Sequence, residues 1–395
     1  MNKRLTLTVI LIGFSSLVLA QNYRAFEDLK SGKWGFEDPL NGKVVIQPKY
    51  QFAYSFTEGL ASVQLNNLWG YVNAKGEEII PFKLTFAGSF TNGSASVTDE
   101  NYQSYHIDKT GKPLYLEKYE VVFEFFEGLA AAKKNEAWGY IDKTGKTIIP
   151  FNFDDAGNFK YGKAIVGLGG AEKKFGVINK QGKILVPITS NSKPYFSEGL
   201  AFIDDAKKVI VDTLGKVAFP VNQYTFVYPF REGMAVTDKS EQEGIKLLGY
   251  INKQGKVLVP SIYDEAADFY EGMGSVAKNG KFGFVNKLGK LAISLQYEAS
   301  HSFDGGLAAV QKVGKWGYID KNGKVIIPFQ FQTPGFFYEG LAAVEKDGKY
   351  GFINKLGKML IPFQYDDVEY SFRNGVARVV KDGEAFYINN KGQRL

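Results

Sequence analysis

The sequence predicts an all-β protein made of about eleven tandem repeats. One short pattern, an aromatic residue followed by Gly and a second aromatic residue, returns along nearly the whole chain. The composition, with 44 Gly, 32 Phe and 23 Tyr among 395 residues, favours strands and tight turns. No long segment with helical spacing of apolar residues separates the predicted strands, which disfavours parallel βαβ folds.

The repeat is clearest when two copies are compared. Residues 315–328 read KWGYIDKNGKVIIP and residues 137–150 read AWGYIDKTGKTIIP. A mean spacing of about 35 residues, typical of repeat proteins, separates successive copies of the first aromatic position: Trp34, Trp69, Ser104, Trp138, Phe175, Lys208, Leu248, Phe282, Trp316, Tyr350 and Ala385. One such unit cannot bury enough apolar surface alone, so the units must stack.

Each unit predicts three short strands. In the copy nearest the C-terminus, Gly340–Lys346 is the first strand and Asp347-Gly348 is a hairpin turn signal. Lys349–Asn354 is the second strand. The turn from Asn354 to Lys358 has Asx first and Gly fourth, as in a type I turn. Met359–Tyr365 is the third strand.

The remaining features of the unit have steric explanations. Pro362 has no N–H, so it is expected at a strand end, a sheet edge or a bulge. Trp316 and Tyr318 should point to one face of their strand, and Gly317 between them should allow a close backbone approach or a bulge. Residues 366–374 connect two units, and a short helical turn is predicted there.

Length variation is concentrated in the connection before the aromatic-Gly pair. This interval is usually 10 residues, but it is 13 from Gly162 to Phe175 and 15 from Gly233 to Leu248. Specificity tends to reside in loops that vary on a regular scaffold. The loops Leu168–Lys174 and Asp238–Lys246 are therefore the first candidates for a binding site, with tolerated insertions as the alternative.

The arrangement of the units is predicted less directly. A β-propeller usually has four strands per blade and about four to eight blades, whereas this chain has about eleven units and no spacer dividing two rings. The chain ends at Lys391–Leu395, and no spare strand is evident to join its two ends. An open, curved or superhelical array is therefore preferred, and one or two closed propellers are the alternative.

The N-terminus predicts export. Lys3 and Arg4 precede the uncharged apolar stretch Leu5–Leu19, and Val18-Leu-Ala20 offers small residues for cleavage. This combination predicts a signal peptide over residues 1–20, with residues 21–395 as the mature repeat array. The apolar stretch is shorter than the roughly 20 residues that a spanning helix needs.

Composition excludes several classes of site. With no Cys, the chain has no disulfide, thiolate metal site or cysteine nucleophile. A formal charge of +6, with Lys and Arg dispersed, does not predict a nucleic-acid surface. His106 and His301 lie in different repeats, and neither adjoins a nucleophile motif, so packing or surface roles are expected. The run Gly167–Gly170 lacks the Lys and Ser or Thr of a phosphate loop and is interpreted as part of an enlarged hairpin.

Repeated carboxylates are interpreted as structural. One Glu before Gly recurs at a single repeat position, whereas catalytic acids need singular environments; it is present at Glu58, Glu127, Glu198, Glu232, Glu271 and Glu339. Asp and Asn interchange at the first turn position, which fits a turn better than calcium, at Asp108, Asp142, Asp212 and Asp320, and at Asn73, Asn179, Asn252 and Asn354. No catalytic residue, metal ligand or cofactor site is predicted.

The pattern resembles the bacterial WG-repeat family, including its KWG variant, as in Lys33-Trp34-Gly35. The resemblance covers essentially the whole predicted mature chain. Units near Ser104, Lys208 and Ala385 have lost the aromatic-Gly pair but keep the following turn. The resemblance implies a bacterial, envelope-associated β-repeat protein, and it carries no activity, substrate or catalytic residue with it.

These observations together predict a non-enzymatic, exported binding or scaffold protein that presents a β surface to protein partners, since each repeat adds surface without altering its neighbours. The alternative is a glycan- or cell-wall-binding protein. All four Trp occupy the signature position, so exposed Tyr would have to serve as the sugar platform.

Overall fold

A computed structural model describes residues 23–28, 31–39, 42–242, 245–373 and 375–395. The predicted signal peptide, residues 1–20, lies outside these residues, so the prediction of export remains a prediction. Within the described part, no helix combines the length and apolar character needed to cross a membrane.

The described residues form eleven antiparallel sheets of three or four strands, which follow one another along the chain and are called blades 1 to 11. Blades 1 to 3 contain β1 (Arg24–Asp28), β2 (Lys33–Glu37), β3 (Val44–Tyr50); β4 (Phe52–Ala53), β5 (Leu60–Leu65), β6 (Leu68–Asn73), β7 (Glu78–Leu84); β8 (Phe86–Ala87), β9 (Ser94–Thr98) and β10 (Ser104–Asp108). Blades 4 to 6 contain β11 (Val121–Val122), β12 (Leu129–Lys134), β13 (Ala137–Asp142), β14 (Thr147–Phe153); β15 (Asp155–Ala156), β16 (Lys163–Leu168), the 3-10 helix η1 (Gly170–Glu172), β17 (Lys174–Asn179), β18 (Ile184–Ser190); β19 (Leu200–Ile203), β20 (Val209–Asp212) and β21 (Val217–Pro220).

The remaining blades continue the same order. Blades 7 and 8 contain β22 (Phe226–Val227), β23 (Met234–Gln242), β24 (Ile245–Asn252), β25 (Val257–Tyr263); β26 (Glu265–Tyr270), β27 (Met273–Lys278), β28 (Lys281–Asn286) and β29 (Leu291–Tyr297). Blades 9 to 11 contain β30 (Ala299–Ser300), β31 (Ala308–Lys312), β32 (Lys315–Ile319), β33 (Val325–Phe331); β34 (Leu341–Lys346), β35 (Lys349–Asn354), β36 (Met359–Tyr365); β37 (Asp367–Arg373), β38 (Val376–Lys381) and β39 (Glu384–Asn389).

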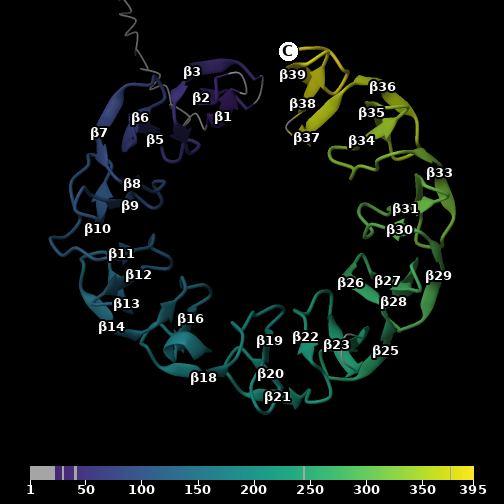
Figure 1. The fold of residues 1–395 in the computed structure, drawn as a ribbon, viewed down its shortest axis with the longest axis horizontal. Helices are drawn as coiled ribbons and strands as arrows, with labels where there is room; N and C mark the ends of the chain where they lie inside the picture. Colours follow the sequence, from purple (N-terminus) through teal and green to yellow (C-terminus); the bar gives the residue numbers. More distant parts are fainter. Residues whose placement is uncertain (1–22, 29–30, 40–41, 243–244, 374) are drawn as a thin grey trace, which may run out of the picture.

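The blades are arranged as a propeller-like ring (Figure 1). The first strand of a blade lies nearest the centre and the last at the outside, as in β26–β29 and β30–β33. The all-β repeat prediction is confirmed. The ring corresponds to the alternative arrangement of the sequence analysis and not to the preferred open array. Many blades have a fourth, inner strand, and the predicted helical turn at residues 366–374 is wrong, because Asp367–Arg373 forms β37.

The Gly of the aromatic-Gly pair and the Pro of the outer strand meet at a β-bulge. Trp316 pairs with Phe331 and Tyr318 pairs with Ile327. Three residues of β33, beginning with Pro328, therefore lie opposite the single residue Gly317 of β32. A Cβ on Gly317 would lie 2.7 Å from the Ile327 carbonyl oxygen. The predictions of a close backbone approach at Gly and of Pro at a bulge are confirmed.

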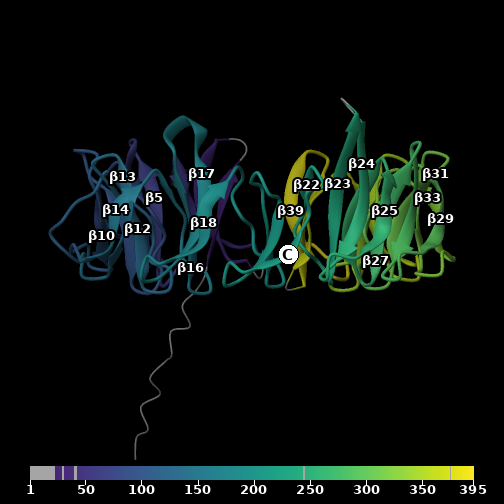
Figure 2. The same cartoon turned by 90° about the horizontal axis from the view of Figure 1, so that it is seen from below.

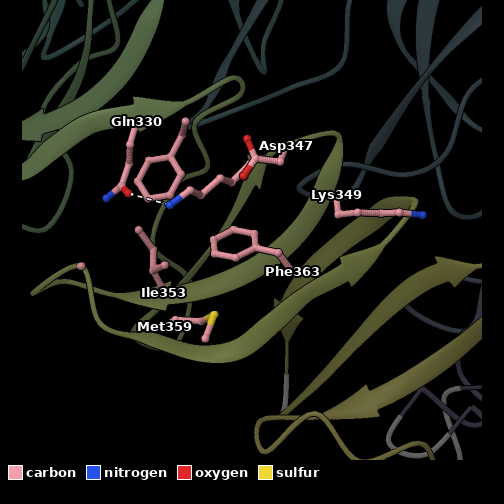
Figure 3. A pocket seen from close by; sticks show the side chains of 9 residues that line it. Gln330, Asp347, Lys349, Ile353, Met359 and Phe363 are labelled. Carbon is pink, nitrogen blue, oxygen red and sulfur yellow. Dashed lines mark hydrogen bonds between the residues drawn. The ribbon is translucent and has the colours of Figure 1, made fainter.

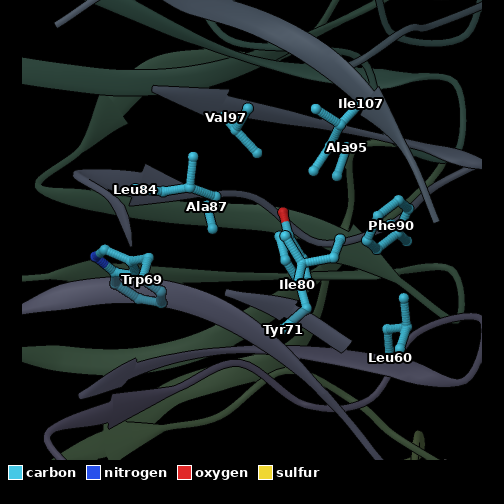
Figure 4. Packing of buried hydrophobic residues seen from close by; sticks show 10 residues of the cluster. All are labelled: Leu60, Trp69, Tyr71, Ile80, Leu84, Ala87, Phe90, Ala95, Val97 and Ile107. Carbon is cyan, nitrogen blue, oxygen red and sulfur yellow. The ribbon is translucent and has the colours of Figure 1, made fainter. Parts of the chain in front are cut away.

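Alternating side chains of each blade pack against different neighbours. Tyr318 belongs to a buried cluster with Ile353 of blade 10, whereas the next residue, Ile319, belongs to a cluster with Phe284 of blade 8. Figure 4 shows one such interface, in which Tyr71 of blade 2 packs with residues of blade 3. Each blade therefore buries both faces, as stacking of single units requires.

Where the second aromatic residue is Tyr, as in blades 2 and 4, it also forms a hydrogen bond to the next blade. The hydroxyl of Tyr71 donates to the carbonyl of Gly88 at 2.7 Å, and Tyr140 donates to Gly157 at 2.8 Å. Each acceptor lies 17 residues further along the chain. Such a bond satisfies a phenol that is fully buried.

Within the part of the chain that the structure describes, the ring closes through side chains and not through a shared strand. Tyr387 of blade 11 occupies the position of Tyr71, and its hydroxyl donates to the Glu37 carboxylate of blade 1 at 2.5 Å. Arg24 of β1 donates to the same carboxylate and to the Tyr387 hydroxyl. A Cβ on Gly42 would lie 2.2 Å from the Tyr387 ring. The Tyr hydroxyl that joins blades 2 and 3 and blades 4 and 5 is thus reused, with a carboxylate as acceptor, to join the last blade to the first.

Candidate functional site

The recurring Glu residues link neighbouring blades. Glu and the following Gly form a tight turn in which both residues are left-handed, for example Glu127 at φ 51° and Gly128 at φ 91°. The six Glu carboxylates accept hydrogen bonds at 2.8 to 3.1 Å from amides of the next blade's turn: Glu58 from Gly93, Glu127 from Gly162, Glu198 from Gly233, Glu232 from Gly272, Glu271 from Gly306, and Glu339 from Gly375.

A Lys of the next blade completes this contact. Five carboxylates have such a Lys at 3.0 to 3.9 Å: Glu58 with Lys109, Glu127 with Lys180, Glu198 with Lys253, Glu232 with Lys287, and Glu271 with Lys321. The Gly162 amide lowers the pKa of Glu127, burial opposes this, and Lys180 lowers it further. We call this arrangement of Glu, Gly amide and Lys the interblade clamp. The structural interpretation of the Glu position is confirmed.

The Asp and Asn residues of the second turn act alike. Oδ1 of Asp142 accepts from the amides of Thr144 and Lys146, and Oδ1 of Asn179 accepts from those of Gln181 and Lys183. Asp and Asn interchange because only one side-chain oxygen is used. Among the described residues, no three His, Asp or Glu side chains gather as metal ligands would.

The two His residues pack against aromatic rings, as expected. His106 is fully buried and stacks on Phe125; its Nδ1 lies 2.6 Å from the Tyr115 hydroxyl and its Nε2 lies 3.0 Å from the Phe123 carbonyl. A carbonyl can only accept, so Nε2 carries the hydrogen of the neutral ring. Burial lowers the pKa of His106 to about 4. His301 stacks on Phe336.

The two candidate loops project from the same face of the ring (Figure 2). Connections in an antiparallel blade alternate between its two ends, so the hairpins between the first and second long strands of a blade lie opposite the Glu-Gly turns. We call the two sides the hairpin face and the clamp face. Leu168–Lys174 contains η1, and Asp154 anchors it by accepting from the amides of Gly169 and Gly170 at 2.7 and 2.9 Å.

The loop Asp238–Lys246 is a continuation of β23 and β24 and not an irregular insertion. Lys239 pairs with Leu247 and Ser240 with Lys246, so the hairpin rises above its neighbours; residues 243–244 lie outside the described residues. At its base, Lys246 Nζ lies 3.1 Å from Asp238 and 2.8 Å from the Tyr228 hydroxyl. Asp238 is buried, and its Oδ1 has no hydrogen-bond partner among the described atoms.

A pocket of about 370 Å³ opens beside this base, between blades 7 and 8. Tyr228, Lys246 and Leu248 line one side, and Asp264 and Asp268 line the other. With Glu265, which also lines the pocket, one ammonium group, three carboxylates and apolar surface are thus brought together from β24 and the start of blade 8. Sequence analysis singled out the loop but not this pocket, because the pocket depends on contact between two blades.

A larger hollow, of about 590 Å³, lies between blades 9 and 10 (Figure 3). It is lined by Ile353, Met359 and Phe363, and two of its ammonium groups are already engaged. Lys346 donates to Gln330 at 3.1 Å, and Lys349 pairs with Asp366.

A family model described as "WG containing repeat" matches ten consecutive segments of the chain: residues 34–69, 69–102, 107–136, 138–170, 175–205, 210–239, 249–282, 282–316, 316–350 and 350–384. The chain belongs to the WG-repeat family. The resemblance found in the sequence is thereby confirmed, including in units that lack the Trp-Gly pair. No curated protein sequence matches this WG-repeat chain.

Two solved structures illustrate the structural similarities of the WG-repeat chain. A crystal structure of the eukaryotic initiation factor has 11% identity, covers 86% of this chain and 95% of its own, and has a TM-score of 0.45. The extracellular domain of the hybrid two-component system BT3049 from B. thetaiotaomicron has 11% identity, covers 95% of this chain and 64% of its own, and has a TM-score of 0.24. At these scores neither carries an argument about this ring.

Proposed function

We propose that this WG-repeat protein is a non-enzymatic scaffold that binds a protein partner through its hairpin face. The supporting observation is that both long connections project from that one face, while the other hairpins there are short. A regular ring with local extensions holds loop residues at defined positions, which reduces the ordering cost of binding.

The hairpin β23–β24 is the main binding element in this proposal. Paired strands are better ordered than an irregular loop, and the pocket beside them presents both signs of charge together with Tyr228 and Leu248. Aromatic and apolar groups surrounded by charges are typical of the centre of a protein interface. We further propose that the protein is bacterial and is exported to the cell envelope by cleavage after Ala20.

The proposal is tested by shortening one hairpin. Ser240–Lys246 is replaced by Asn-Gly, which joins the paired residues Lys239 and Leu247 by a two-residue turn, as Leu65 and Leu68 are joined in blade 2. The variant also carries Asp238→Gln, the residue at the equivalent position Gln64, so that no buried carboxylate loses Lys246. The matched control is Asn67→Gly in the short hairpin of blade 2.

Tagged residues 21–395 and both variants are used as bait in envelope extract. One protein should be recovered saturably by the native chain and by the control, and lost with the shortened hairpin. Equal recovery by all three chains would contradict the assignment to β23–β24. Fractionation and N-terminal sequencing test export, since the mature protein should begin at Gln21.

A further inference from the structure

The clamp face has one interface that differs from the repeat at both charged positions. Between blades 5 and 6, Tyr161 stands at the Glu position and Thr213 stands at the Lys position. Among the interfaces from blade 2 to blade 11, the other clamps keep at least one of the two charged residues. The interface between blades 4 and 5, with Glu127, Lys180 and the Gly162 amide, is the direct comparison.

A pocket of about 270 Å³ opens at this interface. Its walls carry two rings that project into solvent, Tyr161 with 81% of its surface exposed and Tyr195 with 64%. Apolar residues contribute to its lining: Ala164, Ile165, Val177, Pro194 and Phe196. Tyr140 of the repeat core is by contrast fully buried.

The polar groups of the lining are neutral or positive. Asn158 and Thr213 supply an amide and a hydroxyl, and Lys160 and Lys163 supply two ammonium groups. Lys160 Nζ lies 5.5 Å from the centre of the Tyr161 ring, so charge and ring are presented together. Glu127 is the clamp carboxylate beside Tyr161, and it is already engaged, because it accepts from the Gly162 amide at 2.8 Å and pairs with Lys180 at 3.2 Å. Glu198 accepts from the Gly233 amide at 2.9 Å.

This combination suits a sugar that carries a carboxylate. The C–H face of a pyranose stacks on a Tyr ring, its hydroxyl groups pair with amide and hydroxyl side chains, and a uronic-acid carboxylate pairs with Lys. The pocket is below the range of about 300–1,000 Å³ of pockets for drug-sized ligands, so one or two sugar rings would fill it. We propose that the pocket between blades 5 and 6 binds an acidic saccharide, on the face opposite the partner-binding hairpins.

The test replaces the two exceptional residues by the residues that other repeats have at the same positions. The double variant Tyr161→Glu and Thr213→Lys places between blades 5 and 6 the same Glu and Lys that form the clamp between blades 4 and 5. The variant should therefore fold, and its unfolding temperature should be no lower than that of the native chain. Tyr195→Ala removes the second ring alone. Tyr102→Ala, an equally exposed Tyr of blade 3 with 74% exposure, is the control.

Calorimetric titration with trigalacturonate, and with neutral maltotriose, measures binding to residues 21–395. The native chain and Tyr102→Ala should bind trigalacturonate saturably, more weakly as salt is raised, and at least tenfold more tightly than maltotriose. Tyr195→Ala should weaken the binding about tenfold, and the double variant should abolish it. Absence of binding to the native chain, or unchanged binding to a folded double variant, would overturn the proposal. The proposal would also be overturned if the native chain bound a Tyr-containing peptide but not the sugar.

Discussion

Replacing the Gly after the signature aromatic residue by Ala should lower the free energy of unfolding, because the new Cβ would clash with the backbone of the outer strand. In blade 4, a Cβ on Gly139 would lie 2.7 Å from the Ile149 carbonyl oxygen and 3.0 Å from Phe151 Cα, whereas ordinary contacts of a Cβ begin near 3.4 Å. The carbonyl would have to move by about 0.7 Å in a packed interface. Overpacking of this kind costs about 1–3 kcal/mol.

The matched control is Gly157→Ala in the adjacent blade. A Cβ there would meet only the Ile165 carbonyl oxygen, at 3.5 Å, and the φ of Gly157 is not in the left-handed region. Both substitutions reduce the entropy of the unfolded chain equally, by about 0.4–1 kcal/mol in favour of folding. The difference between the two variants therefore isolates the clash, and Gly139→Ala should be less stable than Gly157→Ala by about 1–3 kcal/mol.

Urea unfolding followed by Trp fluorescence measures this difference, because Trp138 lies beside Gly139. The effect should be graded along the chain: Gly283→Ala, with a Cβ 2.4 Å from the Ile293 carbonyl oxygen, should be worse than Gly351→Ala, at 2.9 Å from that of Ile361. A Gly139→Ala variant as stable as Gly157→Ala would refute the steric explanation of the Trp-Gly pair.

Three further predictions concern ring closure and pH. Arg24→Met should cost about 2–3 kcal/mol in urea unfolding because it leaves the buried Glu37 carboxylate without its cation; Tyr387→Phe should cost about 1 kcal/mol, no more than the control Tyr71→Phe. Because burial lowers the pKa of His106 to about 4 from 6.5, its neutral form stabilises the fold above pH 6.5, and about 2 kcal/mol should be lost between pH 7 and 5. That loss should be absent in His106→Phe, and a variant with the same dependence of stability on pH as the native chain would contradict the prediction. Burial raises the pKa of Glu124, which gives the opposite pH dependence in both proteins, so comparing the two cancels it. The lowered pKa of Glu127 stabilises the fold at pH 7, and this stabilisation is lost progressively as the pH falls below about 4.5. Glu127→Gln should therefore cost about 0.5–1 kcal/mol at pH 7 and less at pH 3; equal costs at both pH values would argue against the charged clamp.

The repeat unit could be read from local sequence because its constraints are local. Gly317 predicted a close approach or a bulge, and the repeat Pro predicted a strand end, a sheet edge or a bulge. In the structure Gly317 and Pro328 meet at one bulge of β33. The recurrence of Glu127 and its equivalents predicted a structural role, although the sequence analysis did not identify its partner, the Gly162 amide. A comparison of the repeats at that one position shows Asn92, Tyr161 and Gly305 in place of Glu.

The inner strands were not predicted because they are too short to show the alternation of apolar and polar residues that marks a strand. Phe52–Ala53 is two residues long and is defined by its pairing with Gln64 and Val63, a long-range contact. The pockets were not predicted either, because their lining residues are far apart in the chain. Tyr161 and Thr213 are 52 residues apart in the chain, and only the stacking of blades 5 and 6 brings them to one pocket.

The sequence by itself determined the unit of this protein: its strands, its turns, the Gly and Pro of its bulge, and the apolar faces that require stacking. Only the tertiary structure decided that the units form a ring. Each pair of blades contributes a small rotation that depends on how whole side chains wedge against one another, and no single residue encodes it. Closure then depends on the sum of these rotations, which brings Tyr387 within reach of Glu37, 350 residues away in the chain.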